Sequence, residues 1–374
     1  MRVAIVTESF FPQVNGVTNT VRHVVDRLLQ RGHEVLIVAP GPGLPVYRSV
    51  RVVRVRSFAM PRHRSFSVGM PDAAVERALA EFGPDVVHLA SPIALGAVGL
   101  RASRRLGIPT VAIYQTDISG FVRQYGVRAE GAVGRWVGRI HRRADRTLVP
   151  SRASWDQLVG LGVTDLHLWR RGVALDVFSP QHRLPQLNAR WTRRAPGSIA
   201  VGYVGRLAPE KQVRRLVEVA AVPGTRLVVV GDGPSRASLE RHLPGAVFTG
   251  MLRGEDLAHV FASLDVFVHT GEAETYCQTV QEAQASGVPV VAPAAGGPLD
   301  LVDQGRTGLL YDPADPSSLR ESVARLVGDA ELRRTLATAG LAAVGERTWS
   351  AVVDELIDIH YPAVIVPGSR VLAA

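Results

Sequence analysis

The chain has 374 residues, of which 46% are hydrophobic and 21% are charged. This length predicts two domains, and the composition excludes a disordered chain, a fibre and a coiled coil. No apolar run approaches the roughly 18 residues that a membrane-spanning helix needs. The opening segment Met1–Thr7 is typical of a buried strand and not of a signal peptide. A single cysteine, Cys277, excludes a disulfide framework and a cysteine-based metal cluster, and it favours a reducing cytoplasm.

The net charge of +9 is divided unevenly along the chain. Residues 1–177 contain 24 arginines and 13 acidic residues, a net charge of +11, and the remainder therefore carries −2. A basic half joined to a near-neutral half indicates an anionic partner, and nucleic acid and an anionic lipid surface fit equally well. A genome that favours arginine codons is the alternative, because the only lysine among the 43 basic residues is Lys211.

Apolar runs of strand length alternate with amphipathic segments of helix length through the first half of the chain. This βαβ series predicts a mostly parallel sheet covered on both faces. The expected strands are Val3–Thr7, Glu34–Ala39, Val50–Val55, Val86–Leu89 and Thr110–Tyr114, and the expected helices are Thr18–Arg31 and Asp72–Phe82.

Residues 179–197 interrupt the alternation, and we interpret them as a linker or a surface excursion. The alternation then resumes and predicts a second doubly wound domain, with ligands expected at the carboxyl ends of the strands and in the cleft between the two sheets. The expected strands are Ile199–Val204, Arg226–Gly231, Val247–Thr249, Val266–His269, Val288–Ala292 and Gly308–Leu310, and the expected helices are Val213–Ala221, Ser235–Leu243, Leu257–Ala262, Thr279–Ser286, Leu319–Leu326, Ala330–Thr338 and Ser350–His360.

Two strand-to-helix loops carry features of anion binding. In residues 10–18, Gly16 lets a ligand approach the backbone, although a plain glycine turn explains this loop as well. In residues 205–212, Arg206 and Lys211 flank a turn and are suited to gripping a diphosphate. Because Lys211 is the only lysine, the second loop indicates a required ammonium group more than a solvated surface cation.

Two further strand-to-helix loops carry residues that could contact a nucleotide or a sugar. The segment Gly231-Asp-Gly-Pro-Ser-Arg236 begins like a dinucleotide fingerprint but has Arg236 at its sixth position, so we interpret it as a turn with some nucleotide contact. In the other loop, Glu274 precedes a helix and Glu282 lies about one turn inside it, with the backbone N–H groups of residues 276–278 between them. Carboxylates accept hydroxyl groups and a helix N-terminus takes a phosphate, which together describe a sugar nucleotide. A helix cap with a solvated glutamate is the alternative.

Four motifs in register resemble the retaining glycosyltransferases of family 4. They are the Glu-x7-Glu element Glu274–Glu282 and the segments 205–211, 230–234 and 171–180. The resemblance implies an α/β protein of the GT-B fold, with two Rossmann-like domains facing a central cleft. Residues 1–178 and 350–374 would form the acceptor-binding domain, since the last helix of this family crosses back, and residues 179–349 would bind the nucleotide sugar.

The resemblance also implies the site and its chemistry, the transfer of a sugar with retained anomeric configuration. Arg206 and Lys211 would hold the diphosphate, so no metal or cofactor is implied; Glu274 would bind sugar hydroxyls, and Glu282 the ribose. Residues 249–252 would line the base. The implied donor-binding residues are Gly16, Gly205, Arg206, Lys211, Gly231, Gly250, Met251, Glu274, Tyr276, Cys277, Gln278 and Glu282, and the implied catalytic residues are Arg206, Lys211, Glu274 and Gln115.

Residues 112–121 and 292–298 resemble the GDP-mannose-dependent α-mannosyltransferases of actinobacterial glycolipid synthesis more closely. This resemblance implies a nucleotide sugar and a lipid-linked acceptor as partners, no nucleic acid, and a cytoplasmic enzyme that binds peripherally to the inner face of the plasma membrane. The basic first domain would dock on anionic lipid. The segment Pro61–Phe66 is a candidate contact, although a solvated loop explains it nearly as well.

Two residues depart from the pattern of these relatives. Gln115 stands where many relatives have histidine, and because an amide is neither an acid nor a base, we expect it to hydrogen-bond to the sugar. Cys277 stands where glycine is common, and we expect its thiol to crowd the sugar site.

Three other functions stay open. The enzyme could use UDP-glucose or another donor, or a soluble acceptor. A non-catalytic sugar-nucleotide-binding protein of this fold is the second alternative, and the presence of Gln115, which is neither an acid nor a base, suggests it. A nicotinamide-dependent enzyme is the third, and Arg236 disfavours it.

Overall fold

The structure is a computed structural model that describes residues 1–60, 63–69, 73–117 and 130–365, with side chains described outside residues 58–72 and Glu130. The chain forms two compact units, one of Met1–Arg171 with Trp349–Ala374 and the other of Gly172–Thr348. We call them unit 1 and unit 2. The candidate membrane segment Pro61–Phe66 lies outside the described side chains. None of the helices in the described ranges has both the length and the apolar character that crossing a bilayer requires.

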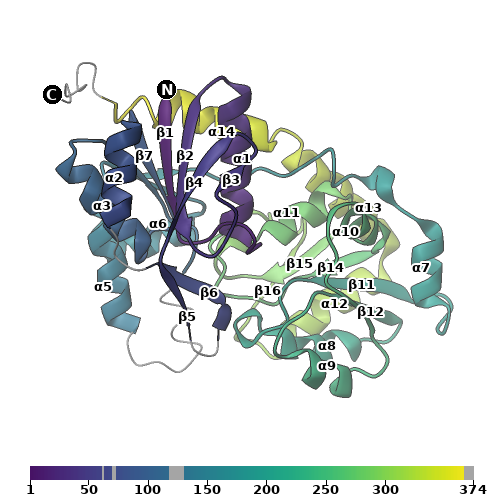
Figure 1. The fold of residues 1–374 in the computed structure, drawn as a ribbon. Coiled ribbons are helices and arrows are strands. Elements are labelled where there is room, and N and C mark those ends of the chain that lie inside the picture. The colour runs from purple at the N-terminus through teal and green to yellow at the C-terminus, as the bar shows by residue number, and fades with distance from the viewer. Residues whose placement is uncertain (61–62, 70–72, 118–129, 366–374) are drawn as a thin grey trace. The chain divides into compact units, whose positions relative to one another are not determined.

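Unit 1 is built on a sheet with the strand order β10-β9-β8-β7-β1-β2-β4-β3, in which only the β3–β4 pair is antiparallel (Figure 1). Its central strand is buried on both faces, as expected for a parallel sheet covered by helices. The strands are β1 Arg2–Thr7, β2 Glu34–Pro40, β3 Val46–Tyr47, β4 Val50–Val55, β7 Val86–Ala90, β8 Thr110–Ile113, β9 Arg146–Val149 and β10 Leu166–Leu168. Strands β5 Ser57–Met60 and β6 His63–Gly69 pair antiparallel in a separate two-stranded sheet.

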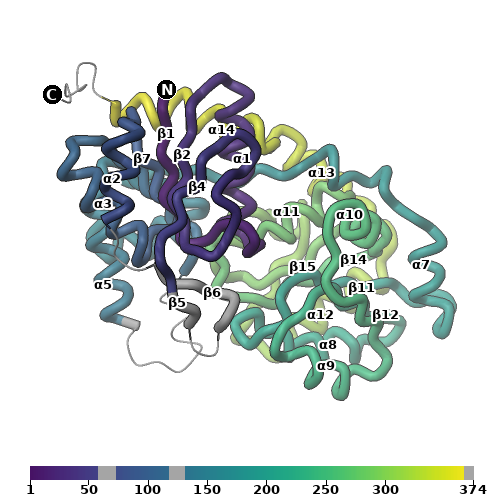
Figure 2. Tube along the Cα trace, viewed as in Figure 1, coloured from purple at the N-terminus to yellow at the C-terminus, as the bar shows by residue number. Residues whose placement is uncertain are grey.

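The helices of unit 1 include one from the far end of the chain. Helix α14 lies beside α1, so the yellow and purple segments are neighbours in Figure 2. Arg27 contacts Asp354 at 2.5 Å, and His23 stacks on Trp349 with ring centroids 4.3 Å apart. These contacts attach the C-terminal segment to unit 1. The helices are α1 Gly16–Gln30, α2 Ala73–Phe82, α3 Leu95–Arg105, α5 Glu130–His141, α6 Arg152–Gly160 and α14 Trp349–Glu355, which continues as the π-helix η5 Leu356–His360.

Unit 2 contains a parallel sheet with the order β13-β12-β11-β14-β15-β16. Alternate residues of β11 enter different apolar clusters, Ala200 and Val204 on one face and Val201 and Tyr203 on the other, because successive strand side chains point to opposite faces. Both faces are therefore covered. The strands are β11 Ile199–Val204, β12 Thr225–Val230, β13 Val247–Gly250, β14 Val266–Val268, β15 Val290–Pro293 and β16 Leu309–Tyr311.

The described helices of unit 2 separate these strands in the doubly wound pattern that the sequence predicts. The α-helices are α7 Pro185–Thr192, α8 Leu216–Ala220, α9 Arg236–His242, α10 Gly254–Ser263, α11 Gln278–Ala285, α12 Ser318–Gly328 and α13 Ala330–Val344. Short 3-10 helices are η1 Pro180–His182, η2 Pro209–Lys211, η3 Val213–Arg215 and η4 Gly297–Asp300.

Of the two interpretations of residues 179–197, the linker is wrong and the surface excursion is confirmed, because the segment belongs to unit 2 and most of its residues are exposed. This segment forms η1 and α7 and packs on unit 2, where the Trp191 side chain is buried. Arg183 donates hydrogen bonds to the carbonyl groups of Ala262 and Leu264 and contacts Asp265 at 2.7 Å. Long-range contacts of this kind leave no periodic pattern in the segment itself, which is why the sequence did not indicate them.

The boundary between the units also differs from the expected one after residue 178. Unit 2 begins at Gly172, because Val173 pairs with Thr348 and donates its N–H to the Arg347 carbonyl. Phe178 is part of the unit 2 core. The chain therefore changes units before the proline-rich segment, and not within it.

Candidate functional site

Three loops of unit 2 meet at the carboxyl edge of its parallel sheet. They are residues 205–212 after β11, residues 231–235 after β12 and residues 269–277 after β14. Strand β11 lies between β12 and β14, so the direction of winding changes beside it. Doubly wound sheets bind ligands at such a switch point. The strand order thus brings together motifs that are up to 70 or so residues apart in sequence.

A carboxylate and two nitrogen groups meet at this switch point. The Lys211 ammonium lies 2.5 Å from Oε1 of Glu274, and Nε2 of His269 lies 3.1 Å from the same oxygen. The Lys211 side chain is 28% exposed and that of Glu274 is 14% exposed. Lys211 ends the 3-10 helix η2, where its carbonyl accepts a hydrogen bond from the Thr270 hydroxyl at 2.6 Å. The cation is therefore held in position and remains partly accessible to a ligand.

Each charged group in this cluster favours the ionised form of its neighbours. Burial would raise the pKa of Glu274, but the Lys211 ammonium and His269 outweigh burial and lower this pKa far below its usual range. Burial would lower the pKa of Lys211, and Glu274 raises it instead. Burial likewise would lower the pKa of His269, but Cys277 and Glu274 raise it to about 9. The carboxylate is thus ionised and surrounded by cations at neutral pH.

Cys277 begins helix α11 with left-handed backbone angles, φ 78° and ψ 71°. Such angles favour glycine, so a cysteine is strained there. Its side chain is only 5% exposed. Ligand-type atoms of Cys277, His269 and Glu274 lie within 4.8 Å of one another. The thiol is therefore next to the Glu274 carboxylate, where we expected it to crowd a sugar.

A metal ion could in principle use these three atoms, but the Lys211 ammonium already neutralises the Glu274 carboxylate. A cation would have to displace it against charge repulsion. That the site works without metal stays a prediction.

The start of helix α11 offers backbone donors. The described hydrogen bonds include none from the N–H groups of Gln278 and Thr279, and no side chain caps this helix. The Gln278 side chain binds the Gly172 carbonyl at 2.9 Å, and the Tyr276 side chain is buried in the core. Gln278 and Tyr276 can therefore contact a bound sugar nucleotide through their backbone groups only. Free N–H groups at a helix N-terminus are suited to a phosphate.

Glu282 lies one turn into the same helix. Within the described part of the chain its carboxyl group has no hydrogen-bond or ion-pair partner, and burial raises its pKa to about 8. A half-buried, unpaired carboxyl group is costly unless a ligand supplies its hydrogen bonds. This arrangement fits the expected contact with ribose hydroxyls.

The glycines after β12 have a packing reason that the sequence did not show. A Cβ atom at Gly231 would lie 2.0 Å from the Gly205 carbonyl oxygen, and one at Gly233 would lie 2.4 Å from that of Leu207. The Leu207 N–H also donates to the Asp232 carbonyl at 2.9 Å. Gly231 and Gly205 therefore hold two loops in backbone contact, which positions Arg206 and Lys211.

The other predicted donor residues of unit 2 lie on the neighbouring loops. Arg206 is exposed and contacts Glu210 at 3.3 Å. Gly250 has φ 78°, and its carbonyl accepts the Gly231 N–H at 2.8 Å. Met251, which follows, is 62% exposed. Its sulfur accepts a contact from Arg253 at 3.5 Å, and that residues 249–252 line the base stays a prediction.

In unit 1, the predicted residues Gly16 and Gln115 lie near a residue to which the sequence assigned no role. The Arg171 side chain is buried, and its Nη2 donates to the Gln115 carbonyl at 3.4 Å. A Cβ atom at Gly16 would lie 3.0 Å from Nη1 of the same guanidinium. Gly16 therefore leaves room for Arg171, which brings a buried cation to the loops after β1 and β8.

Sequence reasoning missed two further contributors in unit 2. His269 is a single residue at a strand end, and only its distance from Glu274 reveals it. Gly296 and Gly297 pack on the Glu274 loop: a Cβ at Gly296 would lie 2.7 Å from the Glu274 carbonyl oxygen, and the Gly297 N–H donates to that oxygen at 2.7 Å. The resemblance of residues 292–298 could have drawn attention to these glycines.

Comparison with known proteins adds to this geometry. Residues 14–177 match Glycosyltransferase Family 4, and residues 189–342 match the glycosyl transferases group 1. A GDP-mannose-dependent alpha-mannosyltransferase of Mycobacterium tuberculosis is 49% identical over 97% of both chains. A protein of the same description from Corynebacterium glutamicum is 42% identical over 99% of this chain and 91% of its own. The Anabaena HepE structure in complex with UDP matches with a TM-score of 0.79 at 19% identity, covering 96% of this chain and 99% of its own.

Proposed function

This chain belongs to glycosyltransferase family 4, and we propose that it transfers mannose from GDP-mannose to a membrane glycolipid with retention of the anomeric configuration. The two relatives described as GDP-mannose-dependent alpha-mannosyltransferases support the donor and the reaction, because they match this chain over nearly its whole length. The single observation that carries the proposal is the contact of Lys211 with Glu274 at the switch point of unit 2.

The donor diphosphate fits the cationic part of this site. Lys211 and Arg206 supply two cations, and the free N–H groups that begin α11 supply uncharged donors. All of them favour the negative charge that develops on the leaving GDP. Because they are held by the fold before the donor binds, little reorganisation is needed during the reaction.

The sugar and the ribose fit the two carboxyl groups. Ionised Glu274 accepts hydrogen bonds from sugar hydroxyls, and the Glu282 carboxyl group exchanges hydrogen bonds with the ribose hydroxyls. When a donor phosphate takes the Lys211 ammonium, the second Glu274 contact, to His269 at 3.1 Å, keeps the carboxylate oriented. The His269 side chain thus positions the sugar-binding group.

The transfer step needs no protein base. The bond between the mannose anomeric carbon and the GDP oxygen breaks, and the acceptor hydroxyl forms its bond to the same face of that carbon. The hydroxyl proton passes to the departing phosphate oxygen, and Gln115 does not compete for it, because an amide is not a base. This balance leaves GDP and the lengthened glycolipid as the products.

The acceptor and the location of the enzyme form part of the same proposal. The net charge of +11 in residues 1–177 supports peripheral binding to the anionic inner face of the plasma membrane. A lipid-linked acceptor would be encountered at that surface.

The test is a donor panel with radiolabelled sugars and membrane lipids as acceptor. We expect GDP-mannose to label a lipid product with an α-linkage by NMR, and UDP-glucose to give little label. Label from UDP-glucose alone would overturn the proposed donor. The absence of both transfer and donor hydrolysis would overturn the proposed enzyme class. We further predict that EDTA leaves the rate unchanged, because Lys211 and Arg206 serve in place of a metal; a loss restored by added Mg²⁺ would contradict this.

A further inference from the structure

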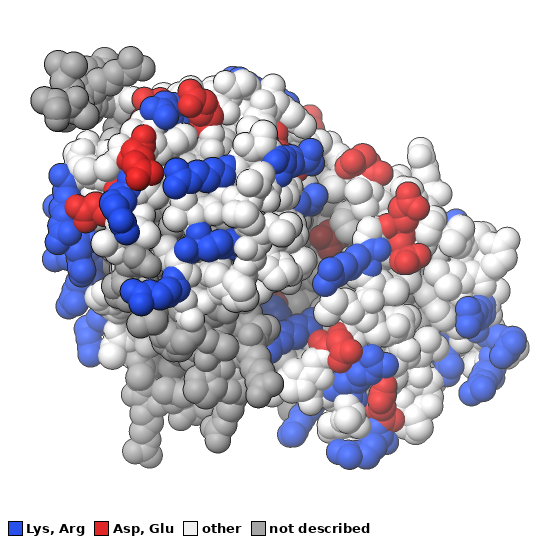
Figure 3. Space-filling model, in the orientation of Figure 1, with Lys and Arg blue, Asp and Glu red and all other residues white. Residues whose placement is uncertain are grey.

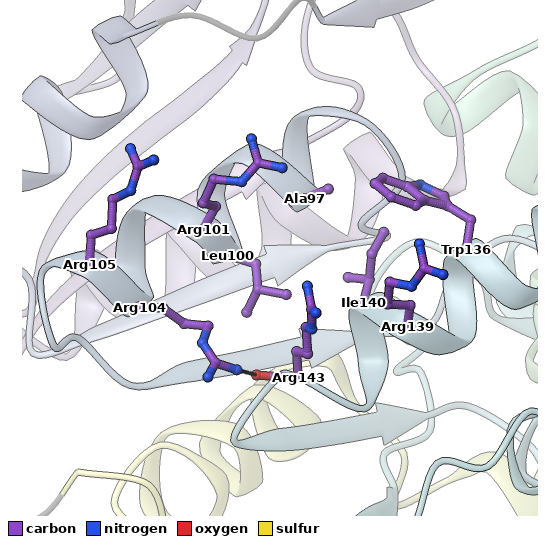
Figure 4. A pocket seen from close by; sticks show the side chains of 9 residues that line it. All are labelled: Ala97, Leu100, Arg101, Arg104, Arg105, Trp136, Arg139, Ile140 and Arg143. Atoms are coloured by element: carbon purple, nitrogen blue, oxygen red, sulfur yellow. Dashed lines mark hydrogen bonds between the residues drawn. The ribbon is translucent and has the colours of Figure 1, made fainter.

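Helices α3 and α5 of unit 1 enclose an open groove of about 470 Å³. Figure 4 shows its lining, with Leu100 between Arg101 of α3 and Arg143, which follows α5. In Figure 3, blue side chains gather along the edge of unit 1 where Figure 1 draws these two helices. The groove is lined by Ala97, Leu100, Arg101, Arg104, Arg105, Trp136, Arg139, Ile140 and Arg143.

The charge of the groove is of one sign. Helix α3 contains no acidic residue, and neither do the described side chains of α5. Arg105 contacts Glu76 at 2.9 Å, and Arg104 donates to the Arg143 carbonyl at 3.4 Å. Among the described residues, Arg101, Arg139 and Arg143 have no acidic partner within salt-bridge distance. Guanidinium groups gathered without counter-charges repel one another, and an anion would relieve that repulsion.

The floor of the groove is apolar and its rim is aromatic. The side chains of Leu100 and Ile140 are buried. Trp136 is 38% exposed, and its indole N–H donates to the Ile93 carbonyl at 2.9 Å, so the ring is fixed at the rim. A partly exposed tryptophan ring beside arginines is typical of a membrane interface.

We propose that this groove binds the phosphate headgroup of an anionic phospholipid and so docks unit 1 on the membrane. The arginines pair with the phosphate, the floor contacts the start of the acyl chains, and the Trp136 ring lies at the level of the headgroups. The inference rests on the proposed function, since a lipid-linked acceptor requires the enzyme at this surface. Charge alone would suit nucleic acid as well, but the apolar floor and the single fixed tryptophan favour a lipid.

The test compares two charge-matched double variants. In the first, Arg101→Gln with Arg139→Gln removes one cation from each side of the groove. In the second, Arg320→Gln with Arg334→Gln removes two exposed cations from α12 and α13 of unit 2, which have no acidic partner among the described residues. Both lower the net charge equally, so the pair separates a groove from a general electrostatic attraction.

Binding is measured by flotation with vesicles of phosphatidylcholine and phosphatidylglycerol in equal parts, and with vesicles of phosphatidylcholine alone. We expect the unchanged protein to float with the anionic vesicles only. The groove variant should bind about 30-fold more weakly and the control variant much as the unchanged protein does. Equal weakening of both variants, or tighter binding of the unchanged protein to RNA than to the vesicles, would overturn the proposal.

Two further readouts keep this outcome separate from the proposed function. The groove variant should retain hydrolysis of GDP-mannose in the absence of lipid, because neither arginine lies in the donor site of unit 2. If hydrolysis and vesicle binding fail together, while the melting temperature is unchanged, the groove proposal fails as stated. Anionic vesicles should also shift the tryptophan fluorescence to shorter wavelength, and Trp136→Phe should abolish most of that shift.

Discussion

The helix N-termini at the switch points of the two sheets differ in whether a side chain already occupies their N–H groups. In unit 1, the buried Glu8 carboxylate accepts the N–H groups of Ile93 and Gly96, both at 2.8 Å, and that of Leu95 at 3.2 Å, at the start of α3. In unit 2, none of the side chains that the structure describes caps α11. The protein supplies its own anion in the first case and leaves the donors to a ligand in the second. The comparison supports our proposal that the donor phosphate binds unit 2, although unit 1 carries the greater positive charge.

The largest expected effect comes from removing a charge at the open switch point. Lys211→Ala or Glu274→Ala should lower kcat/KM for sugar transfer about 1,000-fold, because each removes a charged group expected to contact the donor. Steady-state transfer assays measure this, and the far-UV circular dichroism should be unchanged. Arg214→Ala, which removes an exposed cation just beyond η2, is the matched control and should retain activity. Equal losses in the control and the test variants would refute the specific role.

Removing the built-in anion of unit 1 should affect stability instead of donor binding. Glu8→Ala leaves three N–H groups buried without an acceptor and should lower the free energy of unfolding by about 3 kcal/mol. Glu8→Gln keeps one acceptor oxygen and should cost less. Urea titration gives the stabilities, and the KM for GDP-mannose gives the contrast. If the KM for GDP-mannose rose as much in Glu8→Ala as in Lys211→Ala, the distinction between a structural site in unit 1 and a donor site in unit 2 would be wrong.

The pH dependence of stability tests the charged cluster in unit 2. The pKa of His269 rises from 6.5 to about 9 on folding, so its stabilising contacts with Cys277 and Glu274 are fully present below pH 6.5 and are lost as the pH rises through about 9. His269→Asn removes this contribution. The stability difference between the unchanged protein and the variant should therefore shrink, by about 3 kcal/mol at most, as the pH is raised across this window. Thermal melts at several pH values measure it, and a constant difference would show that His269 does not bear the charge.

The smallest effect is expected at Cys277. Cys277→Gly relieves the left-handed backbone strain but removes a buried side chain, so the two changes should nearly cancel within about 1 kcal/mol. If the thiol crowds the sugar, the donor KM should fall about threefold. Cys277→Ala separates the two causes, because it removes the thiol while keeping the strained Cβ. A KM that rises in both variants would mean that the thiol helps to hold the donor.

Much of the fold could be predicted wherever an element buries an apolar face. Strand β11 runs over Ile199–Val204 and β4 over Val50–Val55, both as expected. Helices α5 and α7 were missed, because α5 is rich in arginine and glycine and α7 is rich in polar residues. Their helical conformation depends on tertiary contacts. Trp191 of α7 is buried only because α7 packs on the rest of unit 2.

The candidate site divides in the same way. The sequence could select Lys211, Glu274 and Glu282 as candidates, since each lies in a local motif with its own spacing, and the structure brings Lys211 and Glu274 into contact. Glu8, Arg171 and His269 could not be predicted, because a single polar residue at the end of a strand carries no local signal of its partner. Gly231 was recognised as a turn residue, but its close approach to the Gly205 carbonyl needed the structure.

The amino-acid sequence by itself determined the alternation of strands and helices, the unequal charge of the two halves and the loops that follow the strands. These features depend on local periodicity and composition, which short stretches of chain carry. Only the tertiary structure decided which loops are neighbours, which helix N-terminus already has an anion and which arginines lack an acidic partner. Those properties depend on distances between residues far apart in sequence, and the strand order sets these distances.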